Sequence, residues 1–459
     1  MIPAALRVLA PEAVLLLAAC VALFGEHIPG IRRSIAGFGA AAATIAALLV
    51  MLPHTTSSFF GSMLLVDPTA SFARVAIGAL TAVFLLWLAA RGMGRERSRE
   101  AAALVLFAAL GGMLMTSAND LVTLYLALEL ATMPAYVLIG YARTDERGLE
   151  GTLKYYLLSL LTSLIMLFGL ALLFTLSGST AYGSLELTHA GTAGLLAAVF
   201  VAVGFLAKMS AAPFHYWAPD AYAGAPAASV AFVSSVPKVA GLVAMARLLL
   251  ALSGRVPGLS LALGTAAVLS MLLGNLAAYP QTDLRRLMAY SGVAHVGYLL
   301  VALTAGSAGM SAAVYYAVAY AVPSMAIMLI SAEEGVTLES LESLASRAPW
   351  KAWVSVLFFL SLIGIPPLAG FFGKLYLFGV ALDAGLVPLV VFAVAMSVVS
   401  LGYYFRVVRA MFARPSAETV PAAAPSAVAA SAIVVLAVAT VAVGIAAGPL
   451  LAPLGFSFP

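Results

Sequence analysis

Residues Gly204–Lys238 read GFLAKMSAAPFHYWAPDAYAGAPAASVAFVSSVPK. Although the surrounding chain is strongly apolar, this stretch contains two lysines, a histidine, an aspartate and several prolines. A lysine near the middle of a membrane helix costs about 2.5–3.5 kcal/mol on insertion scales. Prolines interrupt a helix and free backbone groups, which lipid cannot satisfy but a protein-lined cavity can. We therefore interpret the stretch as an interrupted membrane helix built around the protonation of a buried amine.

The composition is that of an integral membrane protein. The 459 residues are 63% hydrophobic and 9% charged, and their mean hydropathy is +1.08. No soluble fold hides so much apolar surface. The apolar segments are long runs without alternation, which indicates helices and not barrel strands. The single cysteine, Cys20, excludes a disulfide framework and a cysteine-ligated cluster, and the five histidines show no metal-ligand spacing.

The fold class that we predict is an all-α polytopic membrane protein, with about fourteen spans in one transmembrane domain over residues 1–459. The predicted spans are about 8–25, 34–52, 71–90, 101–118, 120–141, 152–176, 192–214, 226–251, 259–279, 286–305, 310–330, 352–376, 384–408 and 428–451. Basic residues gather in every second connection, at Arg32 and Arg33, Arg91–Arg99, Arg143 and Arg147, Arg285 and Arg286, Arg347 and Lys351, and Arg406–Arg414. By the positive-inside rule these connections are cytoplasmic, which puts both termini outside.

The five lysines are the sharpest functional signal. Lys154, Lys208, Lys238 and Lys374 fall inside or at the edge of predicted spans, and only Lys351 is expected in a loop. Arginine stays charged in proteins, whereas a buried lysine can change its protonation state, so these four lysines are candidate members of a proton relay. The alternatives are that Lys154 only snorkels to the membrane surface and that Lys374 is an interfacial anchor.

Two further titratable residues lie near the middle of predicted spans. Glu129 is about ten residues into its span, a rise of roughly 15 Å, and is the acid that matches the lysines. His295 is similarly placed and can titrate in the physiological range. Glu129 could instead form a structural salt bridge, and His295 could be a hydrogen-bonded core histidine. For His215 and Asp220, which adjoin prolines, a role in gating or proton uptake and a role in helix capping are equally supported.

A second interruption reads SLIGIPPLAGFFGKLYLF, residues 361–378, and again a lysine, Lys374, follows it. Spans seven and twelve are therefore both discontinuous, and they cross the membrane in opposite directions because they are five spans apart. This arrangement is typical of inverted repeats. The predicted division is N-terminal helices 1–3 in 1–100, a first five-helix repeat in 101–251, an inverted second repeat in 259–412 and C-terminal helix 14 in 426–459. The tyrosines and tryptophans are interpreted mostly as interface anchors.

Five motifs resemble the antiporter-like membrane subunits of respiratory complex I. They are LKYYLLSL at 153–160, AKMSAAPFHYWAPDAYAGAP at 207–226, VPKVAGL at 236–242, YSGVAHVGY at 290–298 and GIPPLAGFFGKLYLF at 364–378. The lysine in span twelve favours the subunit N type of bacterial proton-pumping NADH:quinone oxidoreductase. The family's functional residues match this chain at Glu129, Lys154, Lys208, Lys238, His295 and Lys374. Ala223 departs from the family, which usually has an acidic residue there.

The resemblance implies a membrane subunit of a translocase, which couples quinone reduction to proton transfer through a midplane Glu/Lys/His relay. It implies no redox centre in this chain; quinone, NADH, FMN and iron–sulfur clusters are expected in partner subunits. The implied partners are other membrane subunits and a peripheral electron-transfer arm, in a bacterial inner membrane and without nucleic acid. One alternative is a subunit of a multi-subunit sodium/proton antiporter. Another is a structural scaffold whose buried charges are inert pairs.

Overall fold

The structure is a computed structural model that describes residues 7–24, 34–52, 56–93, 98–141, 146–187, 189–414 and 426–454. Among these residues, eleven helices are long and apolar enough to cross a membrane. A short antiparallel hairpin, β1 (Ser57–Phe59) and β2 (Leu64–Val66), joins two of the helices. The predicted count of fourteen spans remains a prediction. Outside the described residues lie five of the arginines used for orientation: Arg32, Arg33, Arg95, Arg97 and Arg143.

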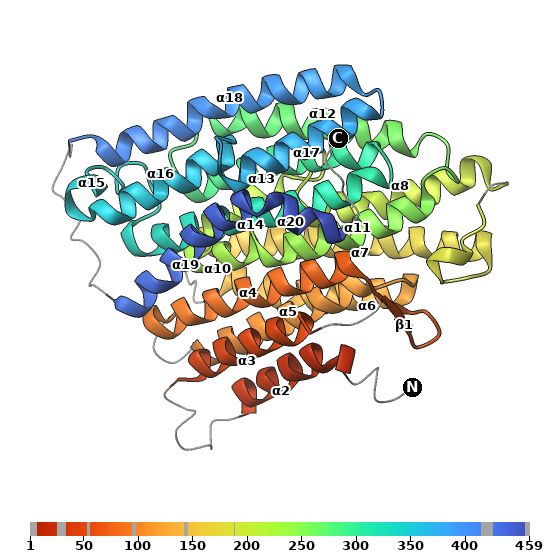
Figure 1. Cartoon of the computed structure of the whole chain (residues 1–459), viewed down its shortest axis with the longest axis horizontal. Helices are drawn as coiled ribbons and strands as arrows, with labels where there is room; N and C mark the ends of the chain where they lie inside the picture. The colour runs from red at the N-terminus through yellow and green to blue at the C-terminus, as the bar shows by residue number, and fades with distance from the viewer. Residues whose placement is uncertain are drawn as a thin grey trace. The chain divides into compact units, whose positions relative to one another are not determined.

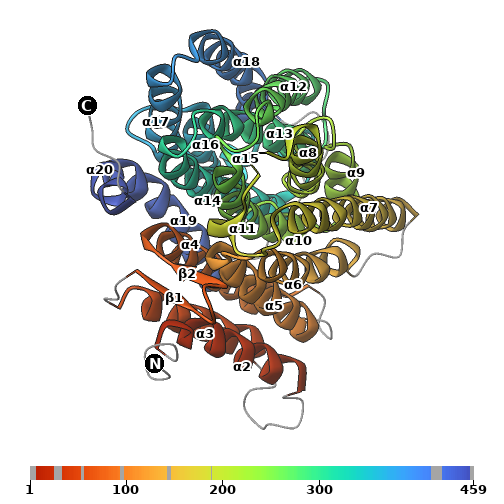
Figure 2. The same ribbon diagram turned by 90° about the vertical axis from the view of Figure 1, so that its right-hand side faces the viewer.

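The helices group into two compact units, of which the first contains most of the N-terminal half. Its helices are α2 (Ala10–Phe24), α3 (Ile35–Val50), α4 (Pro68–Arg91), α5 (Ser98–Ser117), α6 (Leu121–Gly140), most of α7 (Glu146–Ser177), α8 (Gly191–Lys208) and α11 (Val236–Leu252), with the 3-10 turn η2 (Tyr182–Ser184). Helices α3 to α6 lie side by side (Figures 1 and 2).

Small residues and aspartate caps organise the first unit. A methyl group on Gly111 of α5 would lie 2.4 Å from the backbone nitrogen of Ala131 in α6, so glycine is what permits this close helix contact. Asp120 caps α6 by accepting a hydrogen bond from the Val122 amide at 2.9 Å. A buried ion pair of 2.6 Å joins Arg74 of α4 to Glu12 of α2.

The second unit contains the remaining helices, with most but not all of α12, and the first residues of α7. Its elements are α9 (Trp217–Gly224), α10 (Ala227–Val233), α12 (Leu259–Ala278), α13 (Leu284–Thr304), α14 (Ala308–Glu334), α15 (Leu344–Arg347), α16 (Pro349–Ile363), α17 (Ala369–Asp383), α18 (Val387–Phe412), α19 (Ala427–Ile445), α20 (Ala447–Leu451) and η3 (Ala452–Leu454). Helix α14 is its core, because its most apolar stretch is completely buried and it packs against α10, α13, α16, α17 and α19 (Figure 2).

The two predicted helix interruptions are confirmed. Helix α8 ends at Lys208, and the next helix, α9, begins at Trp217. Helix α16 ends at Ile363. The next residue, Gly364, adopts a left-handed φ of 96° that favours glycine, and α17 begins at Ala369. The predicted span 226–251 contains a further interruption that was not predicted, between α10 and α11. The inverted repeats and the division of the chain based on them stay a prediction.

Two expectations about side-chain position are wrong. Lys351 lies in α16 and is buried, not in an exposed loop. Many tyrosines are not interface anchors: among the fully buried side chains are Tyr222, Tyr298, Tyr315, Tyr316, Tyr403 and Tyr404. Lys351 and most of these tyrosines have polar partners inside the protein, which makes their burial tolerable.

Candidate functional site

The first lysine centre lies in the first unit and surrounds the end of α8. Lys208 is the last residue of that helix, and its side chain is 6% exposed. Its ammonium donates hydrogen bonds to the hydroxyls of Tyr136 and of Thr132, the second at 3.4 Å. The carboxylate oxygen Oε1 of Glu129 lies 3.8 Å away. The lysine therefore has one charged and two neutral partners within reach.

Helix α6 supplies all three of these partners. Glu129, Thr132 and Tyr136 are separated by three and four residues, so they share one face of the helix. From α7, the hydroxyl of Ser163 donates a hydrogen bond of 2.7 Å to Oε1 of Glu129. At an effective dielectric constant near 20, a separation of about 4 Å is worth about 4 kcal/mol of attraction. The carboxylate and the lysine are thus strongly coupled without a direct hydrogen bond.

The second lysine centre lies in the second unit, at the break between α16 and α17. The ammonium of Lys374 donates hydrogen bonds to the carbonyl oxygens of Leu362 at 3.1 Å and Ile363 at 2.8 Å, and to Oγ of Ser397 at 2.7 Å. These carbonyls belong to the last turn of α16, where helix geometry leaves carbonyls without intrahelical partners. The interruption therefore provides the acceptors that hold a buried ammonium.

His295 lies in α13 of the same unit and is buried among tyrosines. Its Nδ1 is 2.7 Å from the hydroxyl of Tyr316, and its Nε2 is 3.1 Å from the hydroxyl of Tyr404. The ring of Tyr298 stands edge-on to the imidazole, with centroids 5.6 Å apart, and the Lys374 ammonium lies 5.1 Å from the centroid of that same ring. His295 and Lys374 thus belong to one polar cluster.

Lys238 and Lys154 have contrasting surroundings. Lys238 is the third residue of α11 in the first unit and is 5% exposed. The side chain of Lys154 is 42% exposed; it forms ion pairs of 2.6 Å with Glu150 and 2.9 Å with Asp220. Lys154 is therefore a residue of a charged surface pocket and not of the apolar interior.

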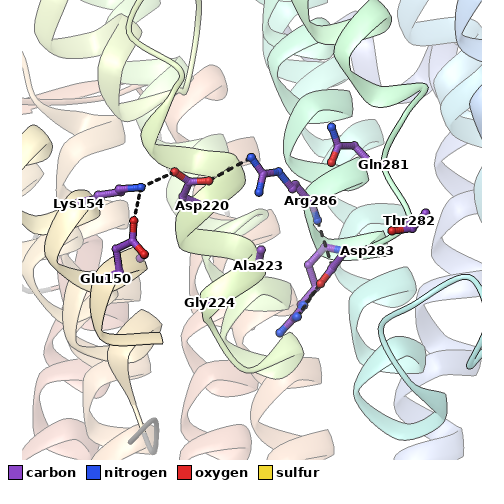
Figure 3. A pocket seen from close by; sticks show the side chains of 11 residues that line it. Glu150, Lys154, Asp220, Ala223, Gly224, Gln281, Thr282, Asp283 and Arg286 are labelled. Atoms are coloured by element: carbon purple, nitrogen blue, oxygen red, sulfur yellow. Dashed lines mark hydrogen bonds and ion pairs between the residues drawn. The ribbon is translucent and has the colours of Figure 1, made fainter. Parts of the chain in front are cut away.

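This pocket lies in the second unit and has a volume of about 650 Å³. Figure 3 shows Asp220 of α9 between two cations, Lys154 on one side and Arg286 of α13 on the other. The Arg286–Asp220 distance is 3.2 Å. Asp220 lies in the first turn of α9, whose N-cap is Tyr216, and its carboxylate pairs with the two cations; its role stays a prediction. Ala223 also lines the pocket, so the position where the family usually has an acid faces this charged group.

His215 lies in the segment between α8 and α9 and is half-buried. Burial lowers the pKa of its imidazole, and a hydrogen bond with the backbone of Pro213 partly opposes that shift. The ring stands 6.5 Å from the ring of Tyr290. The ring contacts of His215 are with Tyr216 and Tyr290, and its role stays a prediction.

The chain is similar to known proteins over most of its length. Residues 118–400 match the family described as NADH:quinone oxidoreductase/Mrp antiporter, TM. The chain belongs to this family. The predicted fold class, a polytopic all-α membrane protein, and the predicted family are therefore confirmed.

Relatives with curated names support the same membership. NADH-quinone oxidoreductase subunit N of Rhodospirillum rubrum is 36% identical over 387 residues, which cover 81% of this chain and 79% of the relative. NADH-quinone oxidoreductase subunit N 1 of Acidiphilium cryptum is 39% identical over 385 residues, covering 81% and 80%. A chain of respiratory complex I from Thermus thermophilus with bound aureothin is 30% identical, with a TM-score of 0.85 and coverage of 96% and 98%. A chain of the Mrp complex from Dietzia sp. is 22% identical with a TM-score of 0.84 and shares the fold.

The sequence predicted the lysines, Glu129 and His295 as site residues, but it did not predict their neutral hydrogen-bond partners. The hydroxyls of Tyr136, Tyr316 and Tyr404 complete the two centres, yet tyrosine in an apolar span gives the same signal as an interface anchor. The only available sign was position: Tyr136 is seven residues from Glu129, which puts both on one helix face. Tyr316 and Tyr404 come from helices other than that of His295, and no spacing within the chain predicts that meeting.

Proposed function

We propose that this chain translocates protons as the N-type, antiporter-like membrane subunit of a NADH:quinone oxidoreductase. The proposed relay consists of Glu129, Lys154, Lys208, Lys238, His295 and Lys374. The observation that carries the proposal is that two lysines, Lys208 and Lys374, are each buried at the interruption of a membrane helix. An arginine would serve better for a permanent ion pair, since it forms more hydrogen bonds and keeps its charge. A lysine at such a position suits a group that must lose and regain a proton.

The proposed sequence of events begins at the charged pocket. Lys154, Asp220 and Arg286 form a polar opening where a proton can be taken up. The ion pair of Glu129 with Lys208 then controls the charge of that lysine: when the pair is closed the ammonium is favoured, and when it opens this attraction is lost. Its strength of about 4 kcal/mol is enough to shift an equilibrium about a thousandfold. Transfer continues through Lys238 and His295 to Lys374, from which the proton leaves.

The driving reaction takes place in other subunits of the complex. We propose that quinone, NADH, FMN and iron–sulfur clusters are bound by partner chains and that this chain has no redox centre. Its partners are other membrane subunits and a peripheral electron-transfer arm. The location is the bacterial inner membrane, with both termini outside, in accordance with the basic residues of alternate connections.

The test is Lys208→Met in the intact complex, reconstituted into vesicles. Methionine keeps the volume and the apolar stem but cannot carry a proton. We expect proton translocation driven by quinone reduction to fall at least about tenfold, since positioned proton transfer typically contributes about 10²–10⁴-fold. The matched control is Lys351→Arg, because Lys351 is also a buried lysine but lies outside the relay. An unchanged rate of translocation for Lys208→Met would rule the proposal out.

A sodium/proton antiporter without an attached enzyme is the alternative. The shared fold of the Mrp chain does not distinguish the two functions, because a likeness at 22% identity shows the fold alone. The relatives at 36% and 39% identity favour the oxidoreductase. Isolation of the complex from its native membrane decides between them, because iron–sulfur proteins copurify only with an oxidoreductase.

A further inference from the structure

The buried tyrosines of the second unit form a continuous chain of hydrogen bonds through His295. Oγ of Ser291 is 2.5 Å from the hydroxyl of Tyr404, this hydroxyl is 3.1 Å from Nε2 of His295, and Nδ1 of His295 is 2.7 Å from the hydroxyl of Tyr316. All four residues are buried, and they come from three helices, α13, α14 and α18. Every link joins two groups that can both donate and accept a hydrogen bond.

We propose that this chain of hydrogen bonds is a proton wire, in which Tyr316 and Tyr404 pass protons to and from the two ring nitrogens of His295. The inference rests on the proposed function and extends it by three residues, Ser291, Tyr316 and Tyr404. The imidazole is suited to this position because one nitrogen can accept a proton while the other releases one. Both nitrogens face hydroxyls here, so neither one is left without a partner for the exchange.

The transfer is balanced in protons and leaves every group neutral. The hydroxyl of Tyr404 gives its hydrogen to Nε2 of His295 and takes one from Ser291, whose own hydrogen is replaced by the proton that enters the wire. At the same time Nδ1 gives its hydrogen to the oxygen of Tyr316, and Tyr316 releases its own hydrogen to the next acceptor. The N–H bond of the ring has then moved from Nδ1 to Nε2, and the reverse exchange or a turn of the ring restores the starting state. No oxidant or reductant takes part.

The position of Tyr316 connects the wire to the second lysine centre. A methyl group on Gly373 of α17 would lie 2.3 Å from the Tyr316 ring, so this ring packs directly against the α17 backbone next to Lys374. Glycine at this position is what allows the contact. Tyr316 thus touches His295 through its hydroxyl and α17 through its ring, and it stands between the two titratable groups of the cluster.

A neighbouring network in the same unit ends at a side-chain amide. Its Tyr403 also interacts with Tyr404, but only as a side branch, so the Tyr403 hydroxyl is not a link of the wire and provides a comparison. The hydroxyl of Tyr403 donates to Oδ1 of Asn275 at 3.2 Å. The amide nitrogen of Asn275 donates to the Tyr298 hydroxyl at 3.2 Å and to the Met271 carbonyl at 2.8 Å. A side-chain amide nitrogen only donates and cannot accept a proton, so this network ends at Asn275. Tyr403 adjoins Tyr404 in α18 and is equally buried.

The experiment compares Tyr316→Phe and Tyr404→Phe with the control Tyr403→Phe in the intact complex. Each change removes one buried hydroxyl and keeps the ring. In vesicles, we expect proton translocation to fall at least about tenfold in the first two variants, and the remaining rate to show an altered solvent deuterium isotope effect. Tyr403→Phe should keep both the rate and the isotope effect. Ser291→Ala, which deletes a single atom, should shift both readouts in the same direction and serves if a phenylalanine variant does not assemble.

The outcomes separate the wire from the proposed function. Equal losses in all three phenylalanine variants would show that the hydroxyls only stabilise the core, and the wire would be overturned. Full activity of Tyr316→Phe and Tyr404→Phe, alongside a loss in Lys374→Met, would also overturn the wire and leave the proposed function standing. Full activity of Lys374→Met would instead refute the proposed function.

Discussion

The change Lys351→Met tests whether a buried charge network holds the N-terminal end of α16. Lys351 Nζ is 2.7 Å from Oε2 of Glu333 and 2.5 Å from Oε1 of Glu334, two residues at the end of α14. Arg347 completes the network with a distance of 2.9 Å to Glu334. Two cations therefore face two carboxylates.

The burial of this network sets the size of the expected effect. The side chains of Lys351, Glu333 and Glu334 are 7%, 3% and 0% exposed. Removing one member of a buried pair costs about 3–5 kcal/mol, because the remaining charge stays buried with less compensation. We expect Lys351→Met to lower the free energy of unfolding by that amount. The second change Glu333→Gln should restore most of the loss, because it leaves Arg347 and Glu334 as one balanced pair.

Thermal and denaturant unfolding of the chain in detergent, followed by tryptophan fluorescence, measures the effect. Trp350 reports on the site directly, since the Lys351 ammonium lies 5.8 Å from the centre of its ring. Lys154→Met is the control, because that lysine is 42% exposed and pairs at the surface; its midpoint should not change. A loss below about 1 kcal/mol for Lys351→Met, with no recovery in the double variant, would refute the reasoning.

Two further changes test the lysine centres. Glu129→Gln removes an attraction of about 4 kcal/mol on the Lys208 ammonium, so we expect at least a tenfold loss of proton translocation in vesicles, and normal translocation would contradict the coupling. Gly373→Ala places a methyl group 2.3 Å from the Tyr316 ring, and we expect poor assembly of the complex, seen as a reduced yield on native gels; a normal yield would mean that α17 shifts without cost.

The membrane helices and their interruptions could be predicted because both follow from local chemistry. A run of about twenty apolar residues has the length of a span, and prolines near a lysine mark a place where a helix cannot continue in lipid. The predicted span 120–141 accordingly matches α6 (Leu121–Gly140) closely. The break inside the predicted span 226–251 was missed because the span was predicted from its continuous hydropathy, although Pro237, the second residue of α11, is a signal for the start of a new helix.

The burial of Lys351 and of the tyrosines could not be predicted, because it depends on partners distant in the chain. Lys351 is followed by an apolar span and preceded by a polar connection, which is also the pattern of a residue at a membrane surface. Its carboxylate partners lie 17 and 18 residues earlier. Tyr404 meets His295 across 109 residues. Hydropathy is averaged over a window of neighbouring residues. It therefore carries no information on whether a polar side chain will find a hydrogen-bond or ion-pair partner on another helix.

The two lysine centres solve the same physical problem in different ways. Helix C-termini carry partial negative charge from carbonyls without partners, so they favour a nearby cation. Lys208 is placed in the last turn of its own half-helix, α8, and its further partners come from α6. Lys374 belongs to α17 but reaches back to the terminal carbonyls of the preceding half-helix, α16. In both cases an interrupted helix provides negative potential inside an apolar bundle; Lys208 has in addition the Glu129 carboxylate at 3.8 Å, whereas the hydrogen bonds of Lys374 go to neutral acceptors. A partner of that kind holds an ammonium less tightly than a close ion pair would, and it therefore suits a lysine that must release its proton.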